Sequence, residues 1–129
     1  MHWSTKYIGE PYIAGDADCA RLLSRVRREI FKHPTPDEIE IARASSRLGR
    51  VGQMTDLLAI YGKKTEEPQE GDAVLMICAG RPGHIGVYCE IDGEKCVLHA
   101  MENAGMVVRH KIRDLSKFFL TVEGYYKWK

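Results

Sequence analysis

The first half of the chain carries apolar residues at the spacing of amphipathic helices. One stripe follows Cys19 and consists of Leu22, Leu23, Val26 and Ile30, with polar residues elsewhere on the helical wheel. This pattern predicts a helix that starts close to Cys19. It should end at His33, because the residue before Pro34 is disfavoured in the helical conformation.

Two more helices are predicted before residue 62. In the sequence TPDE, Thr35 is a suitable N-cap, the proline suits the first helical position, and Glu38 completes a capping box. Apolar residues then continue as far as Leu48 with a less regular spacing. A third, short helix is expected from Thr55 to Tyr61, before Gly62.

The second half has the pattern of strands. The segment KKTEEPQEGD (63–72) is polar and is expected to be an exposed linker. After it come segments of strand length, predicted as Ala73–Cys78, Ile85–Ile91, Glu94–Met101, Met106–Ile112 and Val122–Trp128. Helices followed by antiparallel strands predict an α+β fold, with N-terminal helices packed on an antiparallel sheet.

The dipeptide Asp92-Gly93 is a strong signal for a two-residue hairpin turn. If Ile91 faces Glu94, then Gly86 lies opposite His99. His84 and His99 then share one face as diagonal neighbours, roughly 7–8 Å apart along the backbone. The other face receives an apolar set that should belong to the core: Ile85, Val87, Cys89, Ile91, Cys96, Leu98 and Ala100.

Composition narrows the class of protein. The chain has 129 residues, 44% hydrophobic and 29% charged, with a net charge of +1. These values predict one soluble domain over residues 1–129 and give no argument for a nucleic-acid partner. The N-terminal sequence contains no signal peptide, and the longest apolar run is too short to span a membrane. We therefore expect synthesis in the cytoplasm and no membrane partner.

Cys19, Cys78, Cys89 and Cys96 are the four cysteines. None of the pairs has Cys-x-x-Cys spacing, so a structural zinc site is not expected. Without a signal peptide, a disulfide framework is not expected either. Apart from Cys19, they are expected to be reduced and buried as small apolar residues. The histidines His2, His33 and His110 have no predicted partner and are assigned to the surface.

The chemistry suggested by these residues is nucleophilic catalysis. A helix N-terminus and a neighbouring histidine both favour the thiolate form of a cysteine. The same histidine can carry a proton to a leaving group, provided that a third polar residue orients its ring. The chain supplies Cys19 as nucleophile, His84 as base and His99 as orienting residue. The two histidines could instead form a structural pair, or bind a metal with Cys19.

Five segments now show a resemblance to a known family: GEPYIAGDADCARL, EGDAVL, PGHIGVY, CVLHA and GYYKW. They resemble the NlpC family of bacterial cell-wall cysteine peptidases, most closely the version found in phage and prophage tails. The resemblance extends from Tyr7 to Trp128. It implies a reduced papain-like fold in which the cysteine begins the central helix.

The resemblance also implies a function. Members of this family hydrolyse amide bonds of peptidoglycan stem peptides, such as the bond between D-γ-glutamate and diaminopimelate. Carried over to this sequence, Cys19, His84 and His99 are the catalytic residues, and Tyr12 corresponds to an aromatic residue beside the nucleophile. The backbone N–H of Cys19 is a natural oxyanion donor. No metal or cofactor is implied. The expected partners are a stem peptide and other phage tail proteins, and the expected place of action is the cell wall.

The chain departs from the family around the cysteine. Arg21 occupies the position of a small residue, which affects the fit of the substrate more than the chemistry, and the segment between Tyr12 and Cys19 is shorter. Asp18 is most simply the N-cap of the helix. Two other functions remain open besides a peptidase. One is a tail module that binds a stem peptide without cutting it, and the other is a related Cys-His acyltransferase or amidase toxin.

Overall fold

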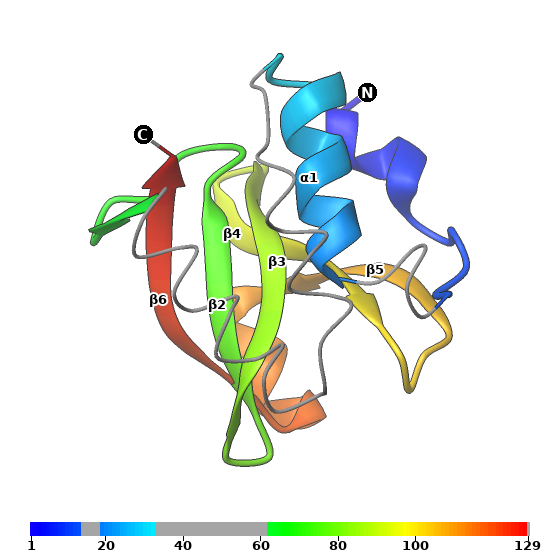
Figure 1. The fold of residues 1–129 in the computed structure, drawn as a ribbon, viewed down its shortest axis with the longest axis vertical. Helices are drawn as coiled ribbons and strands as arrows, with labels where there is room; N and C mark the ends of the chain where they lie inside the picture. The colour runs from blue at the N-terminus through cyan, green and yellow to red at the C-terminus, as the bar shows by residue number, and fades with distance from the viewer. Residues whose placement is uncertain (14–18, 33–61, 129) are drawn as a thin grey trace.

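An antiparallel sheet with helices on it forms the framework of the computed structural model, which describes residues 1–13, 19–32 and 62–128. The α+β class is confirmed. The described elements are η1 (Trp3–Tyr7), α1 (Cys19–Glu29), β1 (Gly62–Thr65), β2 (Ala73–Cys78), β3 (Arg81–Ile91), β4 (Glu94–Met101), β5 (Met106–Lys111), η2 (Ile112–Phe118) and β6 (Leu120–Trp128). The six strands are arranged in the order β1-β6-β2-β3-β4-β5 (Figure 1).

Several sequence predictions concern residues outside these ranges. They are the helices expected after Thr35 and from Thr55 to Tyr61, and the position of Asp18. In the described part of the chain, α1 ends earlier than expected, at Glu29. Lys32 adopts a left-handed conformation with φ of 56°, which a continuing helix does not allow, and its Nζ donates to the carbonyl of Glu29 at 2.8 Å.

The strand predictions agree closely for β2 and β4, whose bounds are those expected from the sequence. The expectation of a linker over residues 63–72 was wrong at its start. Gly62–Thr65 forms the edge strand β1, which pairs with Tyr125–Trp128 of β6. The sequence of β1 has no alternation of apolar and polar residues. An edge strand can be held by backbone hydrogen bonds alone, and its charged side chains protect it from further pairing.

The β3–β4 hairpin has the predicted register. Its pairs run from Ile91–Glu94 to Val87–Leu98. Asp92 and Gly93 form the turn with φ values of 52° and 79°, and positive φ at both positions is what a type I′ turn requires. Beyond Val87–Leu98 no further β3–β4 pairs form among the described residues, although β3 continues along β2 and β4 along β5.

The two faces of the sheet carry different apolar clusters. The first core cluster lies under α1, which packs across β3 and β4 (Figure 1). Its buried members are Tyr7, Leu22, Leu23, Val26, Ala73, Leu75, Ile85, Val87, Cys89, Cys96, Leu98, Ala100 and Val107. It contains the apolar set predicted from the hairpin register, with Ile91 partly buried at its margin. Helix and sheet therefore meet through the residues that the two periodicities indicated.

The second core cluster lies on the opposite face, since its strand residues alternate with those of the first. Its buried members are Val74, Met76, Tyr88, Val97, Leu115 and Leu120. Leu115 comes from η2, a 3-10 helix that the sequence analysis did not predict and that packs against β4, β5 and β6. Phe119, with φ of 62°, ends this helix and turns the chain into β6.

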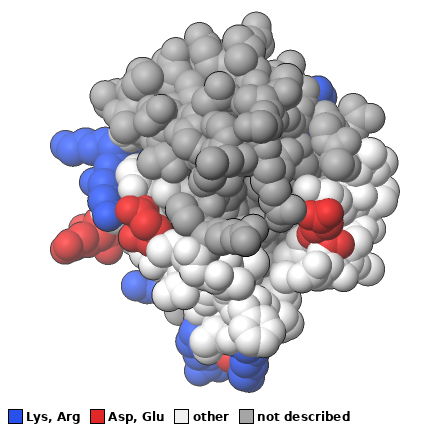
Figure 2. All heavy atoms as spheres, turned by 60° about the horizontal axis from the view of Figure 1, so that its bottom comes forward, with Lys and Arg blue, Asp and Glu red and all other residues white. Residues whose placement is uncertain are grey.

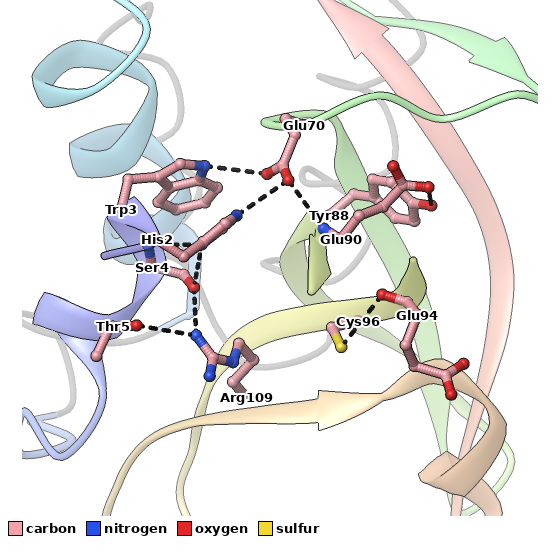
Figure 3. Close-up of polar contacts among 10 residues, drawn as sticks. All are labelled: His2, Trp3, Ser4, Thr5, Glu70, Tyr88, Glu90, Glu94, Cys96 and Arg109. Atoms are coloured by element: carbon pink, nitrogen blue, oxygen red, sulfur yellow. Dashed lines mark hydrogen bonds and ion pairs between the residues drawn. The ribbon is translucent and has the colours of Figure 1, made fainter. Parts of the chain in front are cut away.

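A separate network of charged and polar residues fixes η1 to the sheet (Figure 3). The Glu70 carboxylate accepts hydrogen bonds from Trp3 and from the backbone N–H of Glu90, and it contacts His2, all at 3.0 Å. On the neighbouring side, Arg109 donates to the hydroxyl groups of Ser4 and Thr5 at 2.8 and 3.1 Å. The assignment of His2 to a surface position without a partner was therefore wrong.

Candidate functional site

The two histidines predicted to meet are in contact. His84 lies near the start of β3 and His99 near the end of β4, and Nε2 of His84 is 2.7 Å from Nδ1 of His99. The rings are T-shaped with centroids 5.0 Å apart. Their side chains thus connect β3 and β4 beyond the end of the backbone ladder between these strands.

Gly86 makes this contact possible. A Cβ atom at this position would lie 3.1 Å from the Cβ of His99 and 2.5 Å from Cγ2 of Val97. Such distances are too short for a side chain, so a larger residue here would displace His99. The absence of a side chain at residue 86, opposite His99 in the predicted register, is therefore a geometric requirement of the site.

His110 extends the pair into a chain of three rings. Its Nδ1 lies 3.1 Å from Nε2 of His99, and its own ring stacks on Phe118 of η2, with centroids 4.0 Å apart and planes 9° from parallel. The assignment of His110 to the surface without a partner was wrong. The sequence did contain a signal: a turn over residues 102–105 pairs Met101 with Met106, and the same register places His110 opposite Val97, diagonal to His99.

Burial decreases toward both ends of this histidine chain, which we define as His84, His99 and His110. His99 is fully buried with no exposed surface, whereas His84 and His110 are partly exposed. His99 alternates with Leu98 and Ala100 of the first core cluster. The histidine chain therefore lies on the opposite face of the sheet, with the second core cluster. Among the described residues, Nδ1 of His84 makes no hydrogen bond.

Burial also keeps the histidine chain neutral. Loss of solvent lowers the pKa of His84 to about 4. The pKa of His99 is lowered well below its usual value, first by burial and then by the two neighbouring rings. Burial also lowers the pKa of His110, and the charge of Asp114 opposes this effect. At neutral pH each ring therefore carries one hydrogen, and each can donate one hydrogen bond and accept one.

Cys19 is the first residue of α1 and is partly buried against the first core cluster. Its position at the helix start agrees with the prediction. No hydrogen bond between the Cys19 sulfur and His84 or His99 is present within the described residues. The structure thus brings together the two predicted histidines, and the role of Cys19 as the nucleophile stays a prediction.

The three residues predicted to assist have different positions. Tyr12 is partly buried against the first core cluster, and its backbone N–H donates to the carbonyl of Gly105 at 2.9 Å. Arg21 is partly buried in the first turn of α1. Asp18 lies outside the described residues.

The other cysteines were predicted to be buried, and this is confirmed for two of them. Cys89 and Cys96 face each other across the hairpin and are buried. Burial raises the pKa of the Cys89 thiol to about 12 and also raises that of Cys96. Cys78 is exposed, so that prediction was wrong. It is the last residue of β2, next to the turn at Ala79 and Gly80, where the sheet no longer covers it.

Within the described ranges no three His, Cys, Asp or Glu side chains are arranged to hold a metal ion. Contacts between the rings of the histidine chain use both nitrogens of His99 and one nitrogen each of His84 and His110. No described helix is long and apolar enough to cross a membrane. On the described part of the surface in Figure 2, basic and acidic residues are mixed, and this view shows no extended region of one charge.

Comparison with known proteins gives no family. No family model matches the chain, and no curated protein sequence or solved structure gives a significant match.

Proposed function

We propose that this protein is a cysteine peptidase or amidase that hydrolyses amide bonds of peptidoglycan stem peptides, and that its fold is a reduced papain-like fold. The observation that carries the proposal is the 2.7 Å contact between Nε2 of His84 and Nδ1 of His99. It holds the ring of His84 from one side and leaves the other ring nitrogen for the thiol. A base oriented by a third residue is the arrangement that cysteine and serine hydrolases share.

In the proposed reaction, Nδ1 of His84 accepts the proton of the Cys19 thiol. The thiolate attacks the carbonyl carbon of the scissile amide, and a C–S bond forms. As the C–N bond breaks, the leaving amine takes the proton back. Water then attacks the thioester carbon and gives one proton to His84. The C–S bond breaks, the new carboxyl group is released, and His84 returns that proton to the sulfur of Cys19. No metal or cofactor takes part.

Two features of the fold support this mechanism. Cys19 is in the first turn of α1, where the N-terminal end of the helix dipole favours a thiolate and a developing oxyanion. The β3–β4 ladder ends at Val87–Leu98, so the two strands separate beside His84 and His99. Cys19 packs on the face of the first core cluster, whereas His84 lies on the face of the second. The reaction therefore requires the side chain of Cys19 to reach Nδ1 of His84 through this opening, past the end of the β3–β4 ladder.

The substrate class follows from the resemblance to NlpC peptidases. A bond such as D-γ-glutamyl-diaminopimelate is the proposed target, and the cell wall is the proposed place of action, with phage tail proteins as companions. Arg21 in the first turn of α1 differs from the family and would lie close to the substrate. We therefore expect it to influence which stem peptides are accepted.

The proposal is tested by incubating the purified protein with soluble muropeptides and analysing the products by mass spectrometry. We expect cleavage of one stem-peptide bond by the wild type and by Cys78→Ala, and no cleavage by Cys19→Ala. Cys78 is the matched control, since it is an exposed thiol outside the site. Binding without cleavage by the wild type would contradict the proposal in favour of a binding module. Transfer of the peptide to an added amine, with no hydrolysis, would favour an acyltransferase.

A further inference from the structure

We propose that His110 is a positioning residue that receives, through His99, the positive charge created when His84 takes a proton. This inference rests on the proposed function. The geometry behind it is a continuous row of ring nitrogens: Nε2 of His84 to Nδ1 of His99 at 2.7 Å, and Nε2 of His99 to Nδ1 of His110 at 3.1 Å. Along this row, Nε2 of each ring faces Nδ1 of the next ring.

The neutral row has two possible orders of hydrogens. In the outward order each ring carries its hydrogen on Nε2, so His84 donates to His99, His99 donates to His110, and Nδ1 of His84 is a proton acceptor. In the inward order all hydrogens are on Nδ1, and His84 can only donate at that atom. The proposed reaction needs the outward order, because a base must have a free lone pair.

A proton that enters the outward row can leave its charge at the far end. When an N–H bond forms at Nδ1 of His84, the hydrogen on Nε2 of His84 moves to Nδ1 of His99. The hydrogen on Nε2 of His99 then moves to Nδ1 of His110. His84 and His99 end as neutral rings with hydrogen on Nδ1, and His110 becomes the imidazolium. Reversal of the three transfers returns the proton to the leaving amine.

The surroundings make His110 the best of the three places for the charge. His99 has no exposed surface, and a charge inside such a site lacks solvation. His110 is partly exposed, and the carboxylate of Asp114 in η2 acts on it favourably. Lys117 of the same helix is paired with Asp114 at 3.4 Å. On the β4 side, His110 contacts the neutral ring of His99. The stacked ring of Phe118 keeps the imidazole in line with His99.

This relay gives a signature that a structural role would not produce. On acidification, the ring that becomes doubly protonated should be His110. At the same midpoint, His84 and His99 should only exchange their hydrogen from Nε2 to Nδ1. His110 should become charged at the same pH at which Nδ1 of His84 gains a hydrogen, because both changes result from the same shift of protons along the row.

The test is a pH titration of protein labelled with ¹⁵N-histidine, followed by NMR. The chain has five histidines, and single substitutions assign their signals. His2→Asn serves as control, since His2 contacts Glu70 and Ser4 outside the row, and it should leave the titration and cleavage of muropeptides as in the wild type. We expect a double-protonation signal at His110 and tautomer exchange at His84. A doubly protonated His84 beside a neutral His110, or hydrogen on Nδ1 of His84 at neutral pH, would overturn the relay.

A second measurement uses His110→Asn, which keeps an acceptor oxygen near the position of Nδ1 but cannot hold the charge. We expect kcat for muropeptides to fall about 10- to 100-fold with little change in KM. A wild-type kcat for this variant would show that His110 only holds His99 in place. If the wild type cleaves no muropeptide, the proposed function fails, and the NMR titration still decides whether the relay exists.

Discussion

Two clusters of polar residues lie in this fold, and they are built on different principles. The network around Glu70 and Arg109 joins charged groups to neutral donors and acceptors of η1 and the sheet (Figure 3). The histidine chain joins only imidazole rings, and no carboxylate bonds to any of them within the described residues. In the first cluster, most hydrogen bonds connect the η1 segment to Glu70 or to the sheet. In the second, the row ends at a ring nitrogen without a hydrogen bond.

We propose that the first cluster has a structural role and the second a chemical one. A carboxylate with three partners holds η1 on β3, which is a sufficient reason for its presence. Burial lowers the pKa values of His84 and His99, so these histidines make the fold less stable in acid. Apolar residues in their place would not have this effect. Such an arrangement is typical of sites where proton transfer is the purpose.

The largest expected effect comes from breaking the histidine chain at its centre. His99→Ala removes the acceptor for Nε2 of His84, and we expect muropeptide cleavage to fall about 10²- to 10³-fold. His99→Asn should be milder, because its side-chain oxygen lies near the position of Nδ1 and can still accept from His84. Steady-state kinetics of the two variants measure the difference.

Circular dichroism provides the control for these variants, since both must retain the native spectrum for the comparison to hold. Should His99→Ala cleave at the wild-type rate, His99 is structural and the residue that orients His84 lies elsewhere. By contrast, equal losses for Ala and Asn would mean that the acceptor is not what His99 contributes.

An effect of intermediate size is expected on stability in acid. The pKa of His84 is about 4 in the folded protein and about 6.5 in an unfolded chain, so the unfolded state binds more protons between these values. Stability is therefore complete above about pH 7 and falls as the pH decreases, by about 2 kcal/mol between pH 7 and pH 5 for this one residue. Chemical denaturation at several pH values should show a smaller decrease for His84→Asn than for the wild type. An identical decrease in both would contradict the buried, neutral state of His84.

The smallest effect is expected in the other cluster. Glu70→Gln loses its charge and one of its acceptor oxygens, so the bonds from His2, Trp3 and Glu90 cannot all be kept. We expect a loss of about 1 kcal/mol in the free energy of unfolding and no change in cleavage. Thermal unfolding measures it. Glu123→Gln is the matched control, because the bonds of Glu123 to Lys64 and Tyr126 are exposed, and its effect should be within about 0.5 kcal/mol.

Much of the fold could be predicted because its signals are local. The spacing of Leu22, Leu23 and Val26 indicated α1, and these residues are buried in the first core cluster. The Asp92-Gly93 turn determined the register of β3 and β4, which in turn placed His84 beside His99. A two-residue turn leaves one way to align its strands, and alternation then assigns each side chain to a face.

Other features were decided by segments that are distant in the sequence. Gly62–Thr65 became a strand because β6 offered it a free edge, and backbone hydrogen bonds leave no mark in a polar sequence such as GKKT. η2 is held by the packing of Leu115 in the second core cluster. Cys78 is exposed because the sheet ends beside it.

The histidine chain shows both kinds of determination in one site. The pairing of His84 with His99 follows from the sequence, because one short hairpin connects them. The contact of His110 with His99 needs a second hairpin in the right register, and its stacking on Phe118 needs η2 to fold over that strand. The sequence by itself determined that His84 and His99 share one face of the hairpin. The tertiary structure decided that three histidines form one row and that the row ends at His110. The burial of the rings and the distances between them are set only when separate elements pack together.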